Sequence, residues 1–207
     1  MRDVYANSLV THIVVPSGVE TLVSAFCGYC SGLKVCSLPS ICIEVPDNEN
    51  IQIGIGANLF NNCTSLVSLF LPDGWVNKFY QIFQNCFALT TFVIPSSVDM
   101  LSDYEFDECT NLAEITIQNG LTSIELAVFE DCSGIVSMII LSSVTSIARS
   151  AFLGCSFMTV TFETTIWWSV FDLGSNESTL SSSDLANTST SATYLTTTYT
   201  GYTWLRS

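Results

Sequence analysis

The sequence predicts a solenoid, a right-handed stack of about seven coils of 23 residues that is mostly β-strand, with short helical or 3₁₀ turns and parallel sheets. Three observations lead to this fold class. A template of Phe, Cys three residues later and an aliphatic residue three further recurs along the chain. Two aliphatic residues in alternation follow each copy, as in a strand with one buried face. The template cysteines recur at one constant interval, at Cys63, Cys86, Cys109, Cys132 and Cys155.

The best-formed copy of the template shows the order of elements in one coil. Phe106 begins a helical or 3₁₀ turn, and Cys109 and Leu112 follow at intervals of three residues. Ile115 and Ile117 then alternate with polar residues, which predicts a strand. Turn-forming pairs such as Ser-Ser and Asn-Gly come next, and a second short alternating segment precedes the following Phe. Stacking such coils in register places equivalent strands about 4.8 Å apart in two parallel sheets.

The repeat covers residues 1–163 and is irregular at 27–59, where the interval from Cys30 to Cys63 is longer than the period. We expect a bulging loop or half-coil there. The first residues fit the template only in degenerate form, so the chain begins in mid-repeat. Because stacked repeats need polar caps to stay soluble, this start predicts either a truncated product or an N-terminal face that meets another domain or chain.

Residues 164–207 lose the period and form a separate Ser/Thr- and aromatic-rich segment. Its Ser and Thr content alone suggests a disordered tail, but it holds too many aromatic residues for a chain that buries no surface. We predict a C-terminal cap or tail in which Trp167 and Trp168 cover the last coil, with an exposed Ser/Thr-rich strand or loop beyond them.

Composition excludes two classes of partner. The chain has 5 basic and 19 acidic residues and a net charge of -14, which repels phosphate backbones, so we expect no nucleic-acid binding. The longest apolar run, Ile135–Leu141, is interrupted by Ser137 and is strand-sized, so we expect no membrane span. The first residues contain no apolar signal core, so nothing in them indicates export.

The repeat pattern is similar to a known family. The pattern Pro-Ser-Ser-Val-x-x-Leu-x-x-x-x-Phe-x-x-Cys-x-x-Leu-x-x-Ile-x-Ile, from Pro95 to Ile117, resembles the BspA-like class of leucine-rich repeats, and the resemblance covers about residues 4–163. It implies a leucine-rich-repeat solenoid of the kind found in bacterial and protozoan surface or secreted proteins. It also implies a non-catalytic protein that binds host matrix proteins, other cells or partner proteins, at a cell surface or after secretion.

The cysteines invite a chemical interpretation. Disulfides between successive template cysteines would require distortion, because parallel Cβ vectors hold the Cβ atoms about 4.8 Å apart, so we interpret these residues as core filling. Cys27 and Cys30 form a C-x-x-C pair, and Cys30 fits the repeat with one residue inserted after Phe26. With Cys36 and Cys42 they leave open a minor zinc hypothesis and a disulfide of Cys27 or Cys30 with Cys42. We predict no metal or other cofactor.

Catalytic residues are hard to assemble from this sequence. His12 is the only histidine, so a Ser-His-Asp arrangement would have to be built on it, and the chain has no nucleophile-elbow motif. Glu114 and Glu163 on strand faces could serve as paired carboxylates of a carbohydrate-active enzyme. We predict no catalytic residue and keep this pair as a minor alternative.

The outward face of the strands is the candidate binding surface. Residues beside the buried aliphatics point outward. One outward column is unusually apolar, which is typical of an interaction site, and it consists of Val14, Phe70, Val93, Thr116 and Ile139. The alternatives are simple β-propensity on a tolerant surface, cover by the C-terminal segment, or a structural spacer that stacks end to end. The predicted partner-binding residues are Val14, Ser68, Phe70, Thr91, Val93, Glu114, Thr116, Ser137 and Ile139.

Overall fold

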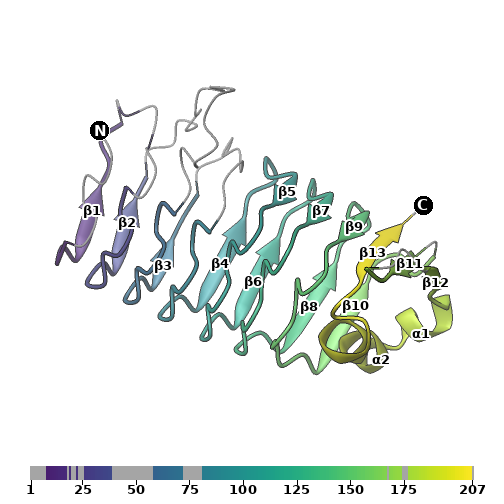
Figure 1. Ribbon diagram of the computed structural model, residues 1–207. Helices are drawn as coiled ribbons and strands as arrows, with labels where there is room; N and C mark the ends of the chain where they lie inside the picture. The colour runs from purple at the N-terminus through teal and green to yellow at the C-terminus, as the bar shows by residue number, and fades with distance from the viewer. Residues whose placement is uncertain are drawn as a thin grey trace.

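A computed structural model describes residues 8–17, 19, 22, 26–38, 58–71, 81–166, 168–173 and 177–206. The chain forms a solenoid in which equivalent strands stand side by side along its length (Figure 1). The first strand of the coil recurs as β1 (His12–Val14), β2 (Val35–Ser37), β3 (Ser68–Leu69), β4 (Thr91–Ile94), β6 (Glu114–Ile117), β8 (Ser137–Ile140) and β10 (Thr159–Phe162). We call the outward side of these strands the strand face.

A second sheet lies on another side of the coils and contains one short strand from each of three successive repeats. These are β5 (Met100–Leu101), β7 (Ser123–Ile124) and β9 (Ser146–Ile147). All pairs within the first set of strands are parallel, and β5, β7 and β9 also pair in parallel. Thus Ile115 pairs with Phe92 and Ile124 pairs with Leu101, each one repeat earlier in the chain. The predicted solenoid with parallel sheets is confirmed.

The strictly regular part of the solenoid is slightly shorter than predicted. Five successive coils keep the Phe and Cys of the template at the spacing of the repeat, against the expected seven. In the coil before them, the Cys27 N–H donates to the Leu59 carbonyl, just as the Phe60 N–H donates to the Ile82 carbonyl. Cys27 therefore occupies the Phe position, and the expected insertion after Phe26 is wrong. Of the bulging loop or half-coil expected at 27–59, residues 39–57 lie outside the described residues.

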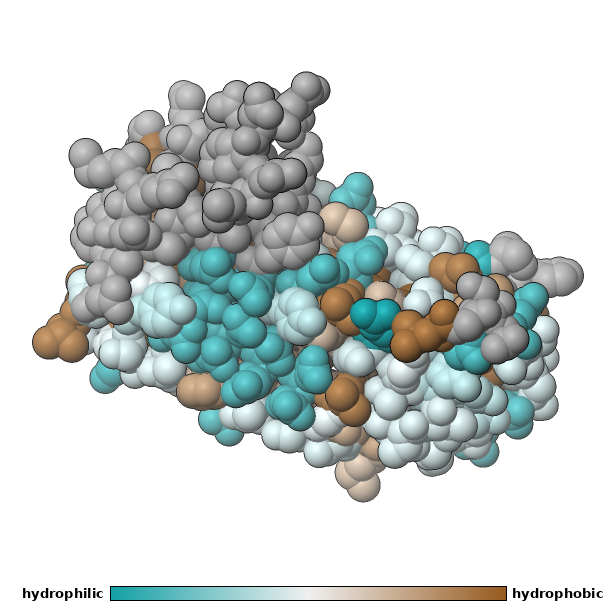
Figure 2. All heavy atoms as spheres, in the orientation of Figure 1, coloured by the Kyte–Doolittle hydropathy of each residue, from teal (hydrophilic) through white to brown (hydrophobic). Residues whose placement is uncertain are grey.

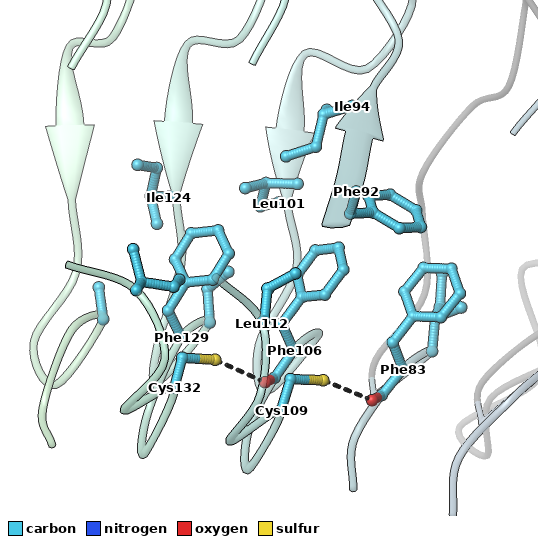
Figure 3. Close-up of a cluster of buried hydrophobic side chains, with 14 of the residues drawn as sticks. Phe83, Phe92, Ile94, Leu101, Phe106, Cys109, Leu112, Ile124, Phe129 and Cys132 are labelled. Carbon is cyan, nitrogen blue, oxygen red and sulfur yellow. Dashed lines mark hydrogen bonds between the residues drawn. The ribbon is translucent and has the colours of Figure 1, made fainter. Parts of the chain in front are cut away.

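The core is a ladder of phenylalanine rings, which continues from coil to coil because the repeat has a constant length (Figure 3). Ring centroids of neighbours lie 5.2 to 5.8 Å apart with interplanar angles of 4 to 17°. Such distances are in the favourable range for offset aromatic pairs. The ladder runs through Phe60, Phe83, Phe106, Phe129 and Phe152, all buried.

The template cysteines form a second ladder beside the rings. Each thiol donates a hydrogen bond to a carbonyl of the preceding coil, as Cys109 does to Phe83 at 3.1 Å and Cys132 to Phe106 at 3.0 Å (Figure 3). The Phe83 carbonyl also accepts from the Cys86 N–H, so both of its lone pairs are used. These cysteines are buried, and burial raises the pKa of Cys63 to about 12. They therefore act as core residues, in agreement with the sequence interpretation.

Each regular coil bends at two residues with left-handed backbone conformation. One precedes the Phe by two positions and the other immediately precedes the Cys. The first group comprises Asn58, Gln81, Tyr104, Ala127 and Ser150, and the second comprises Asn62, Asn85, Glu108, Asp131 and Gly154. Asn, Asp and Gly tolerate this conformation, whereas Glu does not. Glu108, with φ of 59°, is therefore a strained residue in the second group.

Replacing Glu108 with Asn is expected to stabilise the protein by about 1 kcal/mol, because Asn adopts the left-handed conformation at lower cost. The change also removes a carboxylate that acts on Asp107. Chemical denaturation measures the effect. Glu114→Asn is the matched control, since it removes the same charge from an exposed strand residue. Equal effects of the two substitutions would show that charge, and not backbone conformation, is responsible.

The C-terminal segment packs against the last coils and extends the second sheet. It contains β11 (Trp168–Phe171), β12 (Glu177–Thr179), α1 (Ser182–Ala186), α2 (Thr188–Thr193), a π-helical turn η1 (Tyr194–Thr198) and β13 (Thr203–Arg206). Strand β13 lies between β9 and β11 and is antiparallel to both. The second sheet therefore has the order β12-β11-β13-β9-β7-β5. This antiparallel pairing covers the edge that β9 would otherwise expose.

The Ser/Thr-rich stretch of this segment is helical, which corrects the expected strand or loop. Ser181 accepts a hydrogen bond from the Asp184 N–H, and Asn187 accepts one from the Thr190 N–H. Both are N-caps, which favour a helix start where Ser and Thr alone do not. Trp168 is buried, whereas Trp167 lies outside the described residues.

Candidate functional site

The predicted binding residues lie on the strand face. Val14, Phe70 and Ile139 are 77%, 79% and 56% exposed, and Thr116 of β6 is also exposed. The C-terminal segment does not cover them, because the outward residues of β10, the strand nearest to it, remain exposed. The alternative in which the C-terminal segment covers the strand face is therefore wrong.

Strand register shows that the apolar column is interrupted. Ser37 pairs with Val14, so a hydroxyl side chain lies beside the first residue of the apolar column. At the other end, Thr161 pairs with Ile139. Strongly hydrophilic residues instead gather over the middle of the face of the molecule that Figure 2 shows. The strand face is therefore a mixture of apolar and hydroxyl side chains, and the apolar column does not continue from strand to strand.

The strand face is divided where β6 meets β8. Strands β4 and β6 form one two-stranded sheet, and β8 and β10 form another. Within residues 81–166, all of which are described, no ladder joins β6 to β8. The facing edges of these two strands therefore carry backbone N–H and C=O groups that lack ladder partners. Such edges are able to pair with an added strand.

A groove of about 290 Å³ lies at this division. Its apolar lining includes Ile115 and Ile117, which are only half-buried, whereas the equivalent Phe92 and Ile94 on β4 are 3% and 1% exposed. The separation of the strands thus uncovers side chains that the repeat places in the core. The lining residues are Ala113, Glu114, Ile115, Thr116, Ile117, Ser137, Met138, Ile139, Leu141, Thr159 and Thr161.

The groove brings together four of the predicted residues and adds others that the sequence did not indicate. Glu114, Thr116, Ser137 and Ile139 line it, whereas Val14, Ser68, Phe70, Thr91 and Val93 do not. The repeat pattern assigned Ile115 and Ile117 to the core. No sequence signal could have found them, because β6 and β8 keep the regular spacing of the repeat. The division is a property of how two coils stack.

Carboxylates gather on the turn side of the coils, beside the Phe ladder. Asn61 donates to Gln84, and Gln84 donates to the Asp107 carboxylate, each at 2.8 Å. Burial raises the pKa of Asp107, and the nearby Glu108 and Asp131 raise it further, while the hydrogen bond from Gln84 opposes this. Burial also raises the pKa of Glu130, and Asp107 adds to the effect. These carboxyls hold their protons more tightly in the folded protein than in the unfolded chain.

We expect Asp107 and Glu130 to contribute more to the stability of the protein at about pH 4 than at pH 7. Asp107 and Glu130 have folded-state pKa values raised above 3.8 and 4.5. Their contribution to stability is therefore fully present below those values and is lost as the pH rises through the folded-state pKa. Urea denaturation at the two pH values measures the difference. Asp107→Asn keeps an acceptor for Gln84 and should reduce the pH dependence, whereas an unchanged dependence would exclude Asp107 as its source.

The other candidate sites do not assemble. Glu114 and Glu163 lie two strands apart and are offset by four residues along the strand direction. This places their backbones about 16 Å apart, beyond the spacing of glycosidase carboxylates. The Glu163 carboxylate instead accepts from the Ser142 N–H at 2.7 Å. The His12 ring lies 3.0 Å from the Thr11 hydroxyl on an exposed surface. Among the described residues, no three His, Cys, Asp or Glu side chains are placed to hold a metal ion, and Cys42 lies outside them.

The repeat matches the model of one known protein family. The model of the BspA type leucine-rich repeat region matches residues 36–159 in six copies, more than half of the chain. The chain belongs to the BspA-type leucine-rich repeat family. A comparison with curated proteins gave no significant match.

Solved structures of bacterial leucine-rich repeat proteins share the fold of this chain. A leucine-rich cell surface protein from Faecalibacterium prausnitzii matches with a TM-score of 0.66 at 21% identity, over 84% of this chain and 47% of its own. The leucine-rich repeat protein of T. pallidum has a TM-score of 0.51 at 22% identity, over 72% of this chain and 78% of its own. A leucine-rich repeat protein from Eubacterium ventriosum has a TM-score of 0.51 at 24% identity, over 72% of this chain and 44% of its own. The chain thus spans about half the length of the F. prausnitzii protein.

Over the part of the chain that the structure describes, no helix has the length and apolar character needed to cross a bilayer.

Proposed function

We propose that this BspA-type protein is a non-catalytic binding or adhesion protein that holds an extended segment of a protein partner in the groove between β6 and β8. The observation that carries the proposal is the division of the strand face, which leaves a groove of about 290 Å³ between two unladdered strand edges. An extended segment supplies the main-chain hydrogen bonds that such edges lack.

The lining of the groove suits a polypeptide. The half-buried Ile115 and Ile117 offer apolar contact for alternate side chains of an extended segment, and Thr116, Ser137 and Thr161 offer hydroxyls beside them. Pairing through the backbone with pockets for alternate side chains is the usual mode of strand addition. This combination of apolar and hydroxyl side chains also resembles the composition of transient interfaces, which are no more apolar than the rest of a protein surface.

Charge favours a basic partner. Glu114 is the only charged residue in the groove lining, and the whole chain carries a net charge of -14. A field of this sign attracts positively charged surfaces and speeds their association. Affinity should therefore fall as salt is added, because screening shortens the range of that attraction.

The family and the fold suggest the setting. We place the protein at a cell surface, as the name of the F. prausnitzii structure says of that protein. A host matrix or cell-surface protein is the partner class that the family resemblance suggested.

Surface plasmon resonance against immobilised fibronectin and laminin tests the role of the strand face. Replacing the exposed Phe70 and Ile139 with Ser should weaken binding at least tenfold if the partner extends from the groove along the face. The matched control replaces Ile166 and Leu173 with Ser. These two residues are 52% and 81% exposed and lie outside the strands of the strand face. Equal binding by both folded double variants would exclude the strand face.

A further inference from the structure

We propose that Gly134 is the residue that opens the groove between β6 and β8. Because it has no side chain, the turn before β8 lies very close to the preceding coil, and the resulting tilt parts β8 from β6. The inference rests on the proposed function for its effect on binding, whereas its geometry is tested without any partner.

Gly134 lies in the turn that leads into β8, two residues after Cys132. Its φ is outside the left-handed region that favours glycine, so the backbone conformation does not require glycine here. Glycine instead provides room for the close approach of another backbone. The residues at the corresponding position of the other described coils are Gly32, Ser65, Ala88, Asn111 and Phe157.

The backbone of the preceding coil occupies this room. A Cβ atom on Gly134 would lie 2.8 Å from the Leu112 carbonyl oxygen and 2.9 Å from the Thr110 carbonyl oxygen, closer than a Cβ atom can approach. On Gly32, a Cβ atom would lie 3.3 Å from its nearest neighbour and 3.6 Å from the Val10 carbonyl oxygen, the counterpart of that of Leu112. The turn at Gly134 therefore lies closer to the coil before it than the same turn at Gly32 does.

The strand that follows this turn has lost its hydrogen bonds to the preceding coil. In the coil that contains β6, the Ala113 and Gln118 N–H groups donate to carbonyls of the preceding coil at 2.9 and 3.3 Å. The corresponding N–H groups in the coil that contains β8 belong to Val136 and Leu141. Within residues 81–166, which the structure describes throughout, neither of them donates to the β6 coil.

The coil that contains β8 keeps its contacts with the preceding coil on its other sides. The Phe129 ring centroid lies 5.4 Å from that of Phe106, and β9 pairs with β7 through the register of Ser146 with Ser123. Close approach at the turn, together with separation at the strand, therefore means that this coil is tilted and not displaced as a whole.

The size of the residue at this position follows the pairing of the strands. Asn111 and Phe157 precede β6 and β10, and both strands pair with the strand before them. Ala88, the smallest of the series after glycine, precedes β4, which forms no described ladder with β3. Gly32 precedes a paired strand, β2, but its turn does not make the close approach. Larger residues at this position thus accompany a closed ladder.

Gly134→Ala should close the groove. The added Cβ atom moves the turn back toward the spacing found at Gly32, which lets β8 pair with β6 and buries Ile115 and Ile117. Ala fits the backbone conformation of this residue, so the protein should fold. Gly134→Asn introduces the residue of the preceding coil and should act in the same way.

Amide hydrogen exchange, followed residue by residue by NMR, measures the closure. In the wild type, the Val136 and Leu141 amides should exchange at least tenfold faster than the Ala113 and Gln118 amides. In Gly134→Ala, exchange at Val136 and Leu141 should slow at least tenfold, because both N–H groups gain carbonyl partners on the β6 coil.

Gly32→Ala is the matched control, since it adds the same atom at the same position of the repeat, where the contacts are longer. Both substitutions remove the conformational freedom of glycine from the unfolded chain. Gly134→Ala should nevertheless melt several degrees higher than Gly32→Ala, because it alone buries the groove. Its affinity for immobilised fibronectin and laminin should fall at least tenfold, while Gly32→Ala binds like the wild type.

The exchange and binding results separate the two proposals. Unchanged exchange at Val136 and Leu141 in both Gly134 variants, or failure of both to fold, would overturn the role of Gly134. Slow exchange in Gly134→Ala with undiminished binding would support that role and contradict binding in the groove. A wild type that binds neither protein would contradict the proposed function, and the exchange rates would still decide the role of Gly134.

Discussion

Replacing Phe106 with Ala is expected to destabilise the protein by about 3 to 5 kcal/mol. Phe106 is fully buried, and its ring centroid lies 5.2 Å from that of Phe83 and 5.4 Å from that of Phe129. The side chain of Phe92 meets it edge-on at 5.0 Å. Its removal leaves a cavity in the middle of the ring ladder, where neighbouring coils cannot close in because their backbones are held by the strand pairs.

Guanidinium denaturation measures this loss, which is a large part of the roughly 5 to 15 kcal/mol by which native proteins are usually stable. The matched control is Phe70→Ala, which removes the same ring from a site that is 79% exposed. It should change the stability by less than about 0.5 kcal/mol. Similar losses in the two variants would contradict the ring ladder as the centre of the core.

Replacing Trp204 with Ala should cost a similar amount, about 3 to 5 kcal/mol, and should also change the association state. Trp204 is 1% exposed, stacks on Phe162 with a centroid distance of 5.9 Å, and meets Trp168 at 6.3 Å. Its indole N–H donates to the Tyr199 carbonyl at 3.3 Å. These contacts hold β13 against β9, so their loss uncovers the edge of β9 and favours association between molecules.

Thermal unfolding and sedimentation velocity together measure the two effects of Trp204→Ala. Leu205→Ala is the matched control, because Leu205 lies on the same strand but is 42% exposed. It should lower the stability by less than about 1 kcal/mol and leave the protein in its original association state. A Trp204→Ala protein that is as stable as this control would show that β13 is not needed to close the solenoid.

Most of the fold could be predicted from the sequence because it depends on a constant interval. The Phe, Cys and aliphatic positions recur at one period, and a constant interval places equivalent groups in register whatever the details of each coil. Departures from the template were harder to interpret. The position of Phe26 suggested an insertion, but the hydrogen bond of Cys27 to Leu59 shows that the coil aligns through Cys27 instead.

The candidate site could be predicted only in part. Alternation shows which residues point outward, so Thr116 and Ser137 were placed on the strand face correctly. Alternation does not show how far one strand lies from the next. The half-burial of Ile115 and Ile117 results from the missing ladder between β6 and β8, which depends on the packing of two whole coils. The helices of the C-terminal segment were missed because Ser and Thr have low helix propensity, while the N-caps at Ser181 and Asn187 act locally.

The most direct test of the groove is binding of the Ser137→Arg variant to immobilised fibronectin and laminin. Ser137 is an exposed residue of the groove lining, so Arg there should obstruct the groove and repel a basic partner without unfolding the protein. Ser156→Arg is the matched control, since Ser156 is exposed and lies outside the groove. We predict at least a tenfold loss of affinity for Ser137→Arg and none for Ser156→Arg. Equal affinities of the two variants, or the absence of binding by the wild type, would contradict a protein-binding groove between β6 and β8.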